Sequence, residues 1–238
     1  MKHLLRTTRS AEVLDTMFTT VRHFLPTYQT QYADPFCAIA EIPFELEIEN
    51  CSLNDSNPHI INFYRWVKSG DFLKDGWLIN QNTNYNTWSR NKNRFNRLIS
   101  KGKTNTVEAA QLTFYLQHIT TFFSFDSTGT FIGTHDSHGE LPEIDWEAAT
   151  ALMQNWEFNN HDDYTNFVVP EHATLVMSPP TIYTRQWTGF SWDKSAHTDL
   201  LHWANSHSGK VLVFHRRSRT IQGLYADWTE GDRVFQLV

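Results

Sequence analysis

The sequence has 238 residues, of which 40% are hydrophobic and 19% are charged. This composition excludes an intrinsically disordered chain, and the length fits one domain or one domain carrying an insertion. The net charge of −6 argues against a uniformly basic nucleic-acid-binding protein but is compatible with a local basic face. Only two cysteines, Cys37 and Cys51, and no signal peptide or membrane span are visible. We therefore expect a cytoplasmic protein with no membrane association.

The N-terminal part of the chain predicts a helix, a strand and a second helix. Apolar residues recur at helical spacing over residues 10–25, and Ser10 is placed to cap that helix. Residues 31–40 form a short apolar stretch bounded by proline, which predicts a strand and a turn. Pro58 at a first helical position predicts a helix over residues 58–67.

The middle of the chain breaks the strand–helix rhythm and is rich in Asn, Thr, Trp and Arg. Residues 107–118 predict a helix, and residues 122–132 alternate around a Ser-Thr-Gly turn, which predicts a β-hairpin. We therefore expect a mainly helical subdomain at 70–156, inserted into an α/β domain formed by residues 1–69 and 157–238.

The C-terminal third alternates between strands and helices. Buried strands are predicted at 173–177, 210–214 and 233–238, and helices at 194–205 and 219–228. Strands that alternate with helices predict a parallel, doubly wound, Rossmann-like α/β sheet.

Several segments, taken in order, carry a resemblance to a known family. They are Tyr32–Phe36, Leu53–Tyr64, Arg94–Lys103 followed by Glu108–Ala110, Phe125–Phe131, Ser178–Pro180, Phe190–Trp192 and Gly209–Val213. Their sequences and order resemble the Dam-like (D12) class of DNA adenine N6-methyltransferases over nearly the whole chain. The resemblance implies a methyltransferase-like domain with an inserted DNA-recognition subdomain. It also implies S-adenosylmethionine as cofactor and duplex DNA whose target adenine is flipped out.

The resemblance places a cofactor-binding turn directly after Phe36. In the family this turn is rich in glycine, which takes positive φ and lets the backbone approach the cofactor. Here it reads Cys37-Ala38-Ile39-Ala40, without glycine, and β-branched Ile39 disfavours positive φ. The family's glycine-containing N-terminal motif is replaced by Leu5–Ser10. We therefore expect no cofactor, and S-adenosylmethionine only if the chain is still an enzyme.

Two acidic residues match cofactor-contacting positions of the family. The resemblance implies that Asp55 holds ribose hydroxyls and that Asp163 lies near the adenine ring. The alternative is structural, with Asp55 capping the helix that begins at Pro58 and Asp163 capping its own loop. We favour the structural interpretation, because both glycine motifs are missing.

The segment Ser178-Pro179-Pro180-Thr181 stands where the family has its catalytic D-P-P-Y motif. The serine hydroxyl retains a hydrogen-bond acceptor for the adenine amine. Thr181, however, offers no ring for stacking on the base, unless Tyr183 takes that place. We predict that none of these four residues is catalytic in this chain.

Two basic clusters are candidates for contacts with DNA phosphates. The first consists of Arg90, Lys92, Arg94, Arg97, Lys101 and Lys103, and the second of Arg216, Arg217 and Arg219. The alternative is that both are solvated surfaces. The stretch before the hairpin turn lacks the arginine with which family members often contact guanine, so non-specific or altered DNA binding is expected.

Two histidine-containing segments have the residue types of metal ligands. His135-Asp136-Ser137-His138 and His161-Asp162-Asp163 are short and lack distant partner ligands, so we interpret them as loop side chains and expect no metal site.

These observations leave three hypotheses for function. The first is a catalytically inactive methyltransferase homologue that binds double-stranded DNA and shields it from modification or restriction. The second is a protein-interaction scaffold that pairs with an active methyltransferase, with another protein or with itself. The third is a DNA adenine methyltransferase that is still active.

Overall fold

The computed structural model describes residues 4–7, 9–25, 31–74, 76–77, 81–126, 129–181, 192–216 and 218–238. The chain forms two compact units. Unit 1 contains Thr8–Ser56 and Asn155–Val238, and unit 2 contains Lys2–Thr7 and Asn57–Gln154. The expected boundaries at 69/70 and 156/157 differ from this division. The difference arises because the helix that begins at Pro58 packs with the helices of unit 2.

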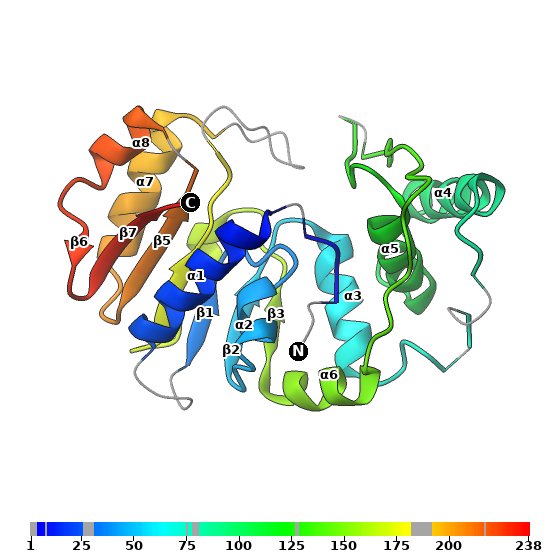
Figure 1. The fold of residues 1–238 in the computed structure, drawn as a ribbon, viewed down its shortest axis with the longest axis horizontal. Helices are drawn as coiled ribbons and strands as arrows, with labels where there is room; N and C mark the ends of the chain where they lie inside the picture. Colours follow the sequence, from blue (N-terminus) through cyan, green and yellow to red (C-terminus); the bar gives the residue numbers. More distant parts are fainter. Residues whose placement is uncertain are drawn as a thin grey trace. The chain divides into compact units, whose positions relative to one another are not determined.

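Unit 1 is built on a seven-stranded sheet with the order β3-β2-β1-β4-β5-β7-β6 (Figure 1). Its strands are β1 (Tyr32–Asp34), β2 (Cys51–Asn54), β3 (Glu157–Asn159), β4 (Thr174–Met177), β5 (Val211–His215), β6 (Thr229–Glu230) and β7 (Arg233–Leu237). All neighbouring strands pair in parallel except β6, which is antiparallel to β7. The predicted parallel α/β sheet is confirmed.

The helices of unit 1 are α1 (Ala11–Phe24), α2 (Glu41–Glu45), α7 (Lys194–Asn205) and α8 (Arg219–Leu224). The side chains of Ser10, Asp193 and Ser218 each accept a hydrogen bond from the backbone N–H three residues later. Such caps satisfy N–H groups that have no partner within the helix, and so they fix where α1, α7 and α8 begin. The predicted helix over 219–228 ends early, at Leu224, and a turn follows.

Both faces of the sheet are covered, as a parallel sheet requires. On one face, Leu175 and Met177 of β4 and Val211 and Val213 of β5 share a hydrophobic cluster with α7 and α8. The intervening Val176 is equally buried and points to the opposite face. There α1, which lies in front of the strands in Figure 1, contacts β5.

The strand order reverses between β1 and β4, which are adjacent in the sheet. From β1 the chain adds β2 and β3 on one side, and from β4 it adds β5 on the other. Ala33 of β1 is in register with Leu175 of β4, so the carboxyl ends of the two strands lie side by side. In open α/β sheets, ligands bind outside the carboxyl ends of the strands at this kind of switch point.

Unit 2 is mainly helical, and its long segment joins β2 to β3. Its helices are α3 (Pro58–Lys68), α4 (Tyr85–Ser100), α5 (Val107–Ile119) and α6 (Trp146–Leu152). α5 packs against both α3 and α4, and α3 also packs against α6. Trp88 and Phe95 of α4 share a core with residues of α5 and with Phe131.

The predicted hairpin is part of a longer antiparallel ribbon in unit 2. Bridges join Thr120 to His135 and Phe125 to Phe131. Ser127 and Thr128, at the expected turn, lie outside the described residues. Across the described residues of both units, we find no helix with the length and apolar character needed to cross a bilayer.

Candidate functional site

Asp34, the last residue of β1, begins the segment that the sequence assigned to cofactor binding. Its carboxylate accepts hydrogen bonds from the Phe36 backbone N–H (2.9 Å) and from the Tyr32 hydroxyl (3.2 Å). The side chain is buried, and burial raises the pKa of the Asp34 carboxyl to about 7, although both hydrogen bonds lower it. Asp34 therefore titrates close to neutrality, inside the fold.

The turn after Phe36 takes positive φ at two alanines. The φ angles are 44° at Ala38 and 50° at Ala40, whereas Ile39 is not among the residues with positive φ. The sequence predicted that a turn without glycine would disfavour this conformation. The structure instead keeps the left-handed backbone and places the small Ala side chain at the two strained positions, at a cost of about 1–2 kcal/mol each.

Asp55 stabilises this turn from the neighbouring strand. Its Oδ2 accepts a hydrogen bond from the Ala38 backbone N–H at 2.9 Å. The expectation that Asp55 caps the helix beginning at Pro58 is wrong. Asn57 caps α3 instead, since its Oδ1 accepts from the His59 N–H at 3.0 Å.

The other expected cofactor residue, Asp163, lies in the segment after β3. Asn54 ties this segment to the sheet by accepting a hydrogen bond from the His161 N–H (2.8 Å) and donating to the Pro35 carbonyl (3.1 Å). Asp163 Oδ1 accepts from the Thr165 N–H at 2.9 Å and so caps the short 3₁₀ helix η3 (Tyr164–Asn166). The structural interpretation of Asp163 as a cap therefore holds.

Three aromatic rings pack together next to the Asp34 turn. Phe36 lies 5.3 Å from Trp192 and 5.6 Å from Tyr164, measured between ring centroids, and Tyr164 lies 5.8 Å from Trp192. Tyr164 and Trp192 are buried within the hydrophobic cluster of α7 and α8. The aromatic cluster thus belongs to the core at this edge of the sheet.

The catalytic-motif segment leaves the sheet next to the Asp34 turn. β4 ends at Met177, so residues 178–181 follow its carboxyl end, beside the segment that follows β1. Pro179 is buried, while Ser178 and Thr181 are partly exposed. Tyr183, the alternative stacking residue, lies outside the described residues. The structure therefore brings the expected cofactor and catalytic segments together at the switch point.

Two buried histidines lie at the same edge, and the sequence indicated neither of them as a ligand. His215 ends β5 and His197 lies on α7, and their ring centroids are 5.1 Å apart. Burial is the main cause that lowers the pKa of each imidazole, to about 4 for His197. No periodicity or motif distinguishes these residues in the sequence, because their proximity depends on the packing of α7 against β5.

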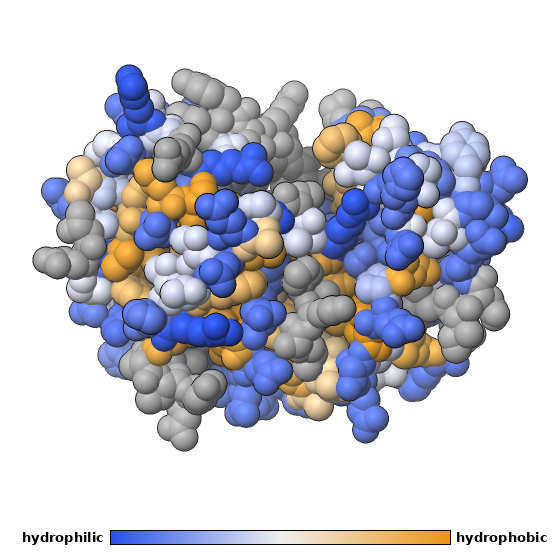
Figure 2. All heavy atoms as spheres, viewed as in Figure 1, coloured by the Kyte–Doolittle hydropathy of each residue, from blue (hydrophilic) through white to orange (hydrophobic). Residues whose placement is uncertain are grey.

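The first basic cluster lies on and just beyond α4 in unit 2. Arg90, Arg94, Arg97 and Lys101 recur at intervals of four, three and four residues, which places them on one helix face, and all four are exposed. Thr87, Trp88, Asn91 and Phe95 form the buried face. Figure 2 shows mainly hydrophilic residues over α4. We call the four exposed cationic residues the basic stripe.

Two members of the first basic cluster have partners within unit 2. The Lys92 ammonium donates to the Gly133 carbonyl at 2.9 Å and lies 5.0 Å from the Trp88 ring centroid. Lys92 thereby ties α4 to the ribbon. Arg94 forms an ion pair with Glu108 at the start of α5. Lys103 is exposed beyond the end of α4.

The second basic cluster follows β5 in unit 1. Arg216 and Arg219 are exposed, and Arg219 is the first residue of α8. Arg217 lies outside the described residues. The described part of this cluster thus offers two cations near the switch-point edge, on a unit whose overall charge is strongly acidic.

The ribbon has an aromatic inner face and a weakly polar outer face. Phe125 and Phe131 pack on Phe95 of α4 at ring-centroid distances of 6.3 and 5.9 Å. Phe122 and Ile132 are 68% and 48% exposed, which marks them as an apolar contact surface on the ribbon.

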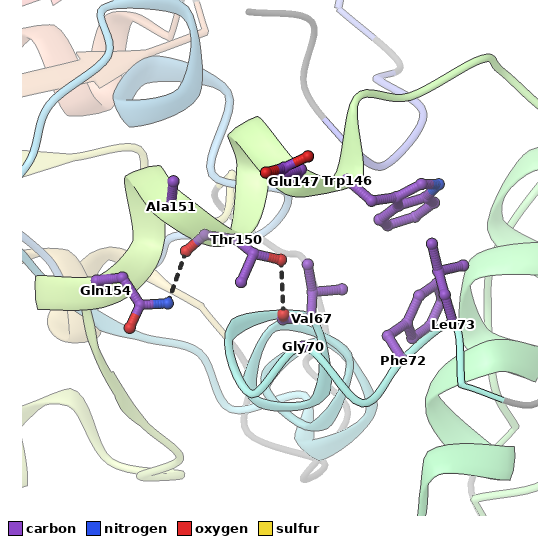
Figure 3. A pocket seen from close by; sticks show the side chains of 9 residues that line it. All are labelled: Val67, Gly70, Phe72, Leu73, Trp146, Glu147, Thr150, Ala151 and Gln154. Atoms are coloured by element: carbon purple, nitrogen blue, oxygen red, sulfur yellow. Dashed lines mark hydrogen bonds between the residues drawn. The ribbon is translucent and has the colours of Figure 1, made fainter.

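A groove of about 530 Å³ lies between the end of α3 and α6 in unit 2 (Figure 3). Its walls are largely apolar and include Phe72, Leu73 and Trp146, with Glu147 and Gln154 as polar members. Thr150 donates to the Val67 carbonyl at 3.1 Å, which fixes α6 against α3.

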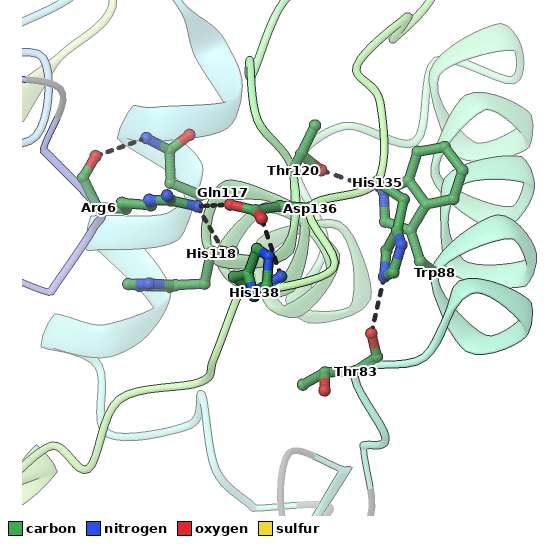
Figure 4. Close-up of polar contacts among 9 residues, drawn as sticks. All are labelled: Arg6, Thr83, Trp88, Gln117, His118, Thr120, His135, Asp136 and His138. Carbon is green, nitrogen blue, oxygen red and sulfur yellow. Dashed lines mark hydrogen bonds and ion pairs between the residues drawn. The ribbon is translucent and has the colours of Figure 1, made fainter.

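His135 and Asp136, two of the residues considered as metal ligands, have other partners (Figure 4). Nε2 of His135 lies 2.8 Å from the Thr83 carbonyl oxygen, and its ring packs against Trp88. Asp136 pairs with Arg6, whose hydrogen bond lowers the pKa of that carboxyl. No cluster of three or more His, Cys, Asp or Glu ligands occurs among the described residues.

No protein-family model matches the chain, and no curated protein matches it.

Proposed function

We propose that this protein is a catalytically inactive relative of the Dam-like adenine methyltransferases that binds double-stranded DNA through the basic stripe of unit 2. The observation that carries the proposal is the exposed row of cations on α4. Residues 76–107 include six Lys and Arg and no Asp or Glu. Such a surface suits phosphate contacts, which position a protein on DNA without selecting sequence.

The distribution of charge between the units supports this assignment. Unit 2 carries 11 Lys and Arg against 9 Asp and Glu, whereas unit 1 carries 9 against 17. The net charges are therefore +2 and −8. The overall charge of −6 is thus the sum of one cationic and one acidic unit. The basic stripe lies on the cationic unit.

Loss of catalysis is supported by two features of the switch-point edge. Ala38 and Ala40 carry Cβ atoms at the positive-φ positions of a turn that in the family is rich in glycine. Thr181 stands where the family has the tyrosine that stacks on the flipped base. A DNA-bound protein of this kind would shield its site from modification or restriction.

Fluorescence anisotropy of a labelled duplex at several salt concentrations tests the proposal. The double variant R97Q/K101Q removes two cations of the stripe, neither of which pairs with an acidic side chain among the described residues. We expect weaker binding. The slope of log binding constant against log salt concentration (the salt slope) should fall in magnitude by about 0.9 for each phosphate contact removed. The matched control R22Q/K194Q removes two exposed cations of unit 1 and should leave the slope unchanged.

An equal effect of both double variants, or no binding at low salt, would contradict a role for the stripe. Transfer of labelled methyl groups from S-adenosylmethionine to duplex DNA, abolished by Ser178→Ala, would contradict the loss of catalysis and establish the third hypothesis.

The groove in unit 2 favours a second candidate function, that of a protein-interaction scaffold. Leu73 in its wall is 37% exposed, and Phe122 and Ile132 add further exposed apolar surface on the same unit. Sedimentation of the full chain tests self-association. A dimer dissociated by Leu73→Asp, with DNA binding unchanged, would favour this candidate.

A further inference from the structure

We propose that His197 and His215 form a binding site for one divalent transition-metal ion, of the Zn²⁺ class, at the carboxyl ends of β4 and β5. This inference is independent of DNA binding, because both residues belong to unit 1 and the basic stripe to unit 2. It rests on the burial, the hydrogen bonding and the separation of the two rings.

The ring nitrogens are the first argument. His197 is fully buried and His215 is 3% exposed. Both nitrogens of His197, and Nε2 of His215, make no hydrogen bond of good geometry among the described residues, although the Pro180 carbonyl lies near both rings. A buried polar atom without a partner is costly, and a bound ion is one of its ordinary explanations.

The hydrogen bond of His215 is the second argument. Its Nδ1 lies 2.6 Å from the Arg216 carbonyl oxygen, which can only accept, so Nδ1 carries the proton. The neutral ring then presents its lone pair at Nε2, the nitrogen without a partner. A ring N–H donated to a backbone carbonyl is the usual support of a metal-ligating histidine.

The separation of the rings is the third argument. Two imidazoles bound to one tetrahedral ion through metal–nitrogen bonds of about 2.0–2.1 Å would have ring centroids about 5 Å apart. The observed separation is 5.1 Å, with the ring planes 78° apart. The pair thus has the ring-centroid spacing expected of two ligands of one ion.

The backbone supplies an oxygen donor beside both rings. The Pro180 carbonyl, which follows the carboxyl end of β4, lies within hydrogen-bonding reach of His197 and of His215. This oxygen and water are the donors we assign to the remaining positions, and imidazole with oxygen ligands suits Zn²⁺ among abundant divalent ions.

Calorimetric titration of the untagged, metal-stripped full chain with Zn²⁺ near neutral pH tests the site. We expect one Zn²⁺ ion to bind per chain. Its affinity should fall by about tenfold or more in His197→Gln and in His215→Gln. The matched control is His172→Gln, which removes an imidazole that is 78% exposed. That variant should bind like the unmodified chain. Circular dichroism establishes that each variant is folded.

Cobalt provides a readout that does not depend on the variants. The unmodified chain should give the intense visible absorption of tetrahedral Co²⁺ at one equivalent, and Zn²⁺ should displace it. If the variants do not fold, this spectrum decides the question. Absence of the spectrum, no Zn²⁺ binding, or equal binding by all the histidine variants would each overturn the proposal.

Discussion

The Asp55 carboxylate and the backbone N–H of Ala38 are joined by a hydrogen bond of 2.9 Å, which links the end of β2 to a left-handed turn after β1. A negatively charged acceptor on a backbone amide makes one of the stronger hydrogen bonds in proteins. The contact therefore helps to hold a conformation that Ala38 by itself disfavours. The turn is stabilised by its neighbour rather than by its own residue types.

Ala38→Gly should stabilise the protein. Ala38 is exposed and has a φ of 44°, so removing its Cβ relieves strain and loses little packing. We expect the free energy of unfolding to rise by about 0.5–1 kcal/mol in urea denaturation. Ala151→Gly, at an exposed position in α6, is the control and should lower it by a similar amount. Destabilisation by both changes would show that the turn is not strained at Ala38.

Asp34→Asn should change how stability depends on pH. The folded pKa of about 7 exceeds the ordinary value of 3.8, so the carboxyl loses its proton at lower pH in the unfolded chain than in the folded one. The free energy of unfolding therefore falls as pH rises between these values, by up to ~4 kcal/mol. Asn preserves the shape and cannot ionise. The variant should exceed the unmodified protein in stability at about pH 8 and match it near pH 4.

Asp136→Asn is a control in which the pH dependence of stability should change in the opposite direction. Its hydrogen bond with Arg6 lowers the pKa of the Asp136 carboxyl, so the ionised group stabilises the fold above its unfolded pKa. That contribution is lost as pH falls through the folded pKa. The Asn variant should be the less stable protein at neutral pH, and the difference should shrink in acid. Equal pH profiles for the Asp34 and Asp136 variants would contradict both assignments.

Gly133→Ala should disrupt the ribbon. A Cβ at this position would lie 2.3 Å from Thr120 Cγ2, 2.5 Å from the Phe122 carbonyl oxygen and 2.6 Å from Phe131 Cζ. One of these atoms belongs to the backbone and cannot turn away, so we expect a loss of about 1–3 kcal/mol in thermal or urea unfolding. Gly223→Ala in α8, where no such contact arises, should instead be neutral or stabilising.

Lys92→Gln tests whether this cation of α4 has a structural role. Its ammonium is engaged with the Gly133 carbonyl and the Trp88 ring. We expect a loss of about 1 kcal/mol of stability. The salt slope of DNA binding should not change, because Lys92 is not part of the basic stripe. A reduced slope with unchanged stability would place Lys92 on the DNA-facing surface instead.

Much of the α/β architecture could be predicted from the sequence, because caps and hydrophobic periodicity are local signals. Ser10 marks the start of α1, and Pro58 the start of α3. The predicted helix over 194–205 coincides with α7. β2 and β3 were not predicted, since Cys-Ser-Leu-Asn and Glu-Phe-Asn lack the run of apolar residues that marks β4 and β5.

The candidate site was predictable only in outline. The resemblance assigned the turn after Phe36 and the segment beginning at Ser178 to one site, and the strands that precede both segments were predicted. The left-handed backbone at Ala38 and the pairing of His197 with His215 depend on contacts between distant segments. The engagement of Lys92 by Gly133 likewise joins residues 41 positions apart in sequence. None of these leaves a local pattern.

The first residues of the chain are built into unit 2, although α1, which follows them, belongs to unit 1. Leu4 and Leu5 are completely buried, and the Leu4 carbonyl oxygen lies 3.0 Å from His118 Nε2. A fragment spanning only residues 57–154 would therefore lack part of its own interior. Trimming the N-terminus through Thr7 should loosen the distant helical unit before it affects the sheet. Experiments that isolate unit 2 need those few residues supplied, covalently or as a peptide.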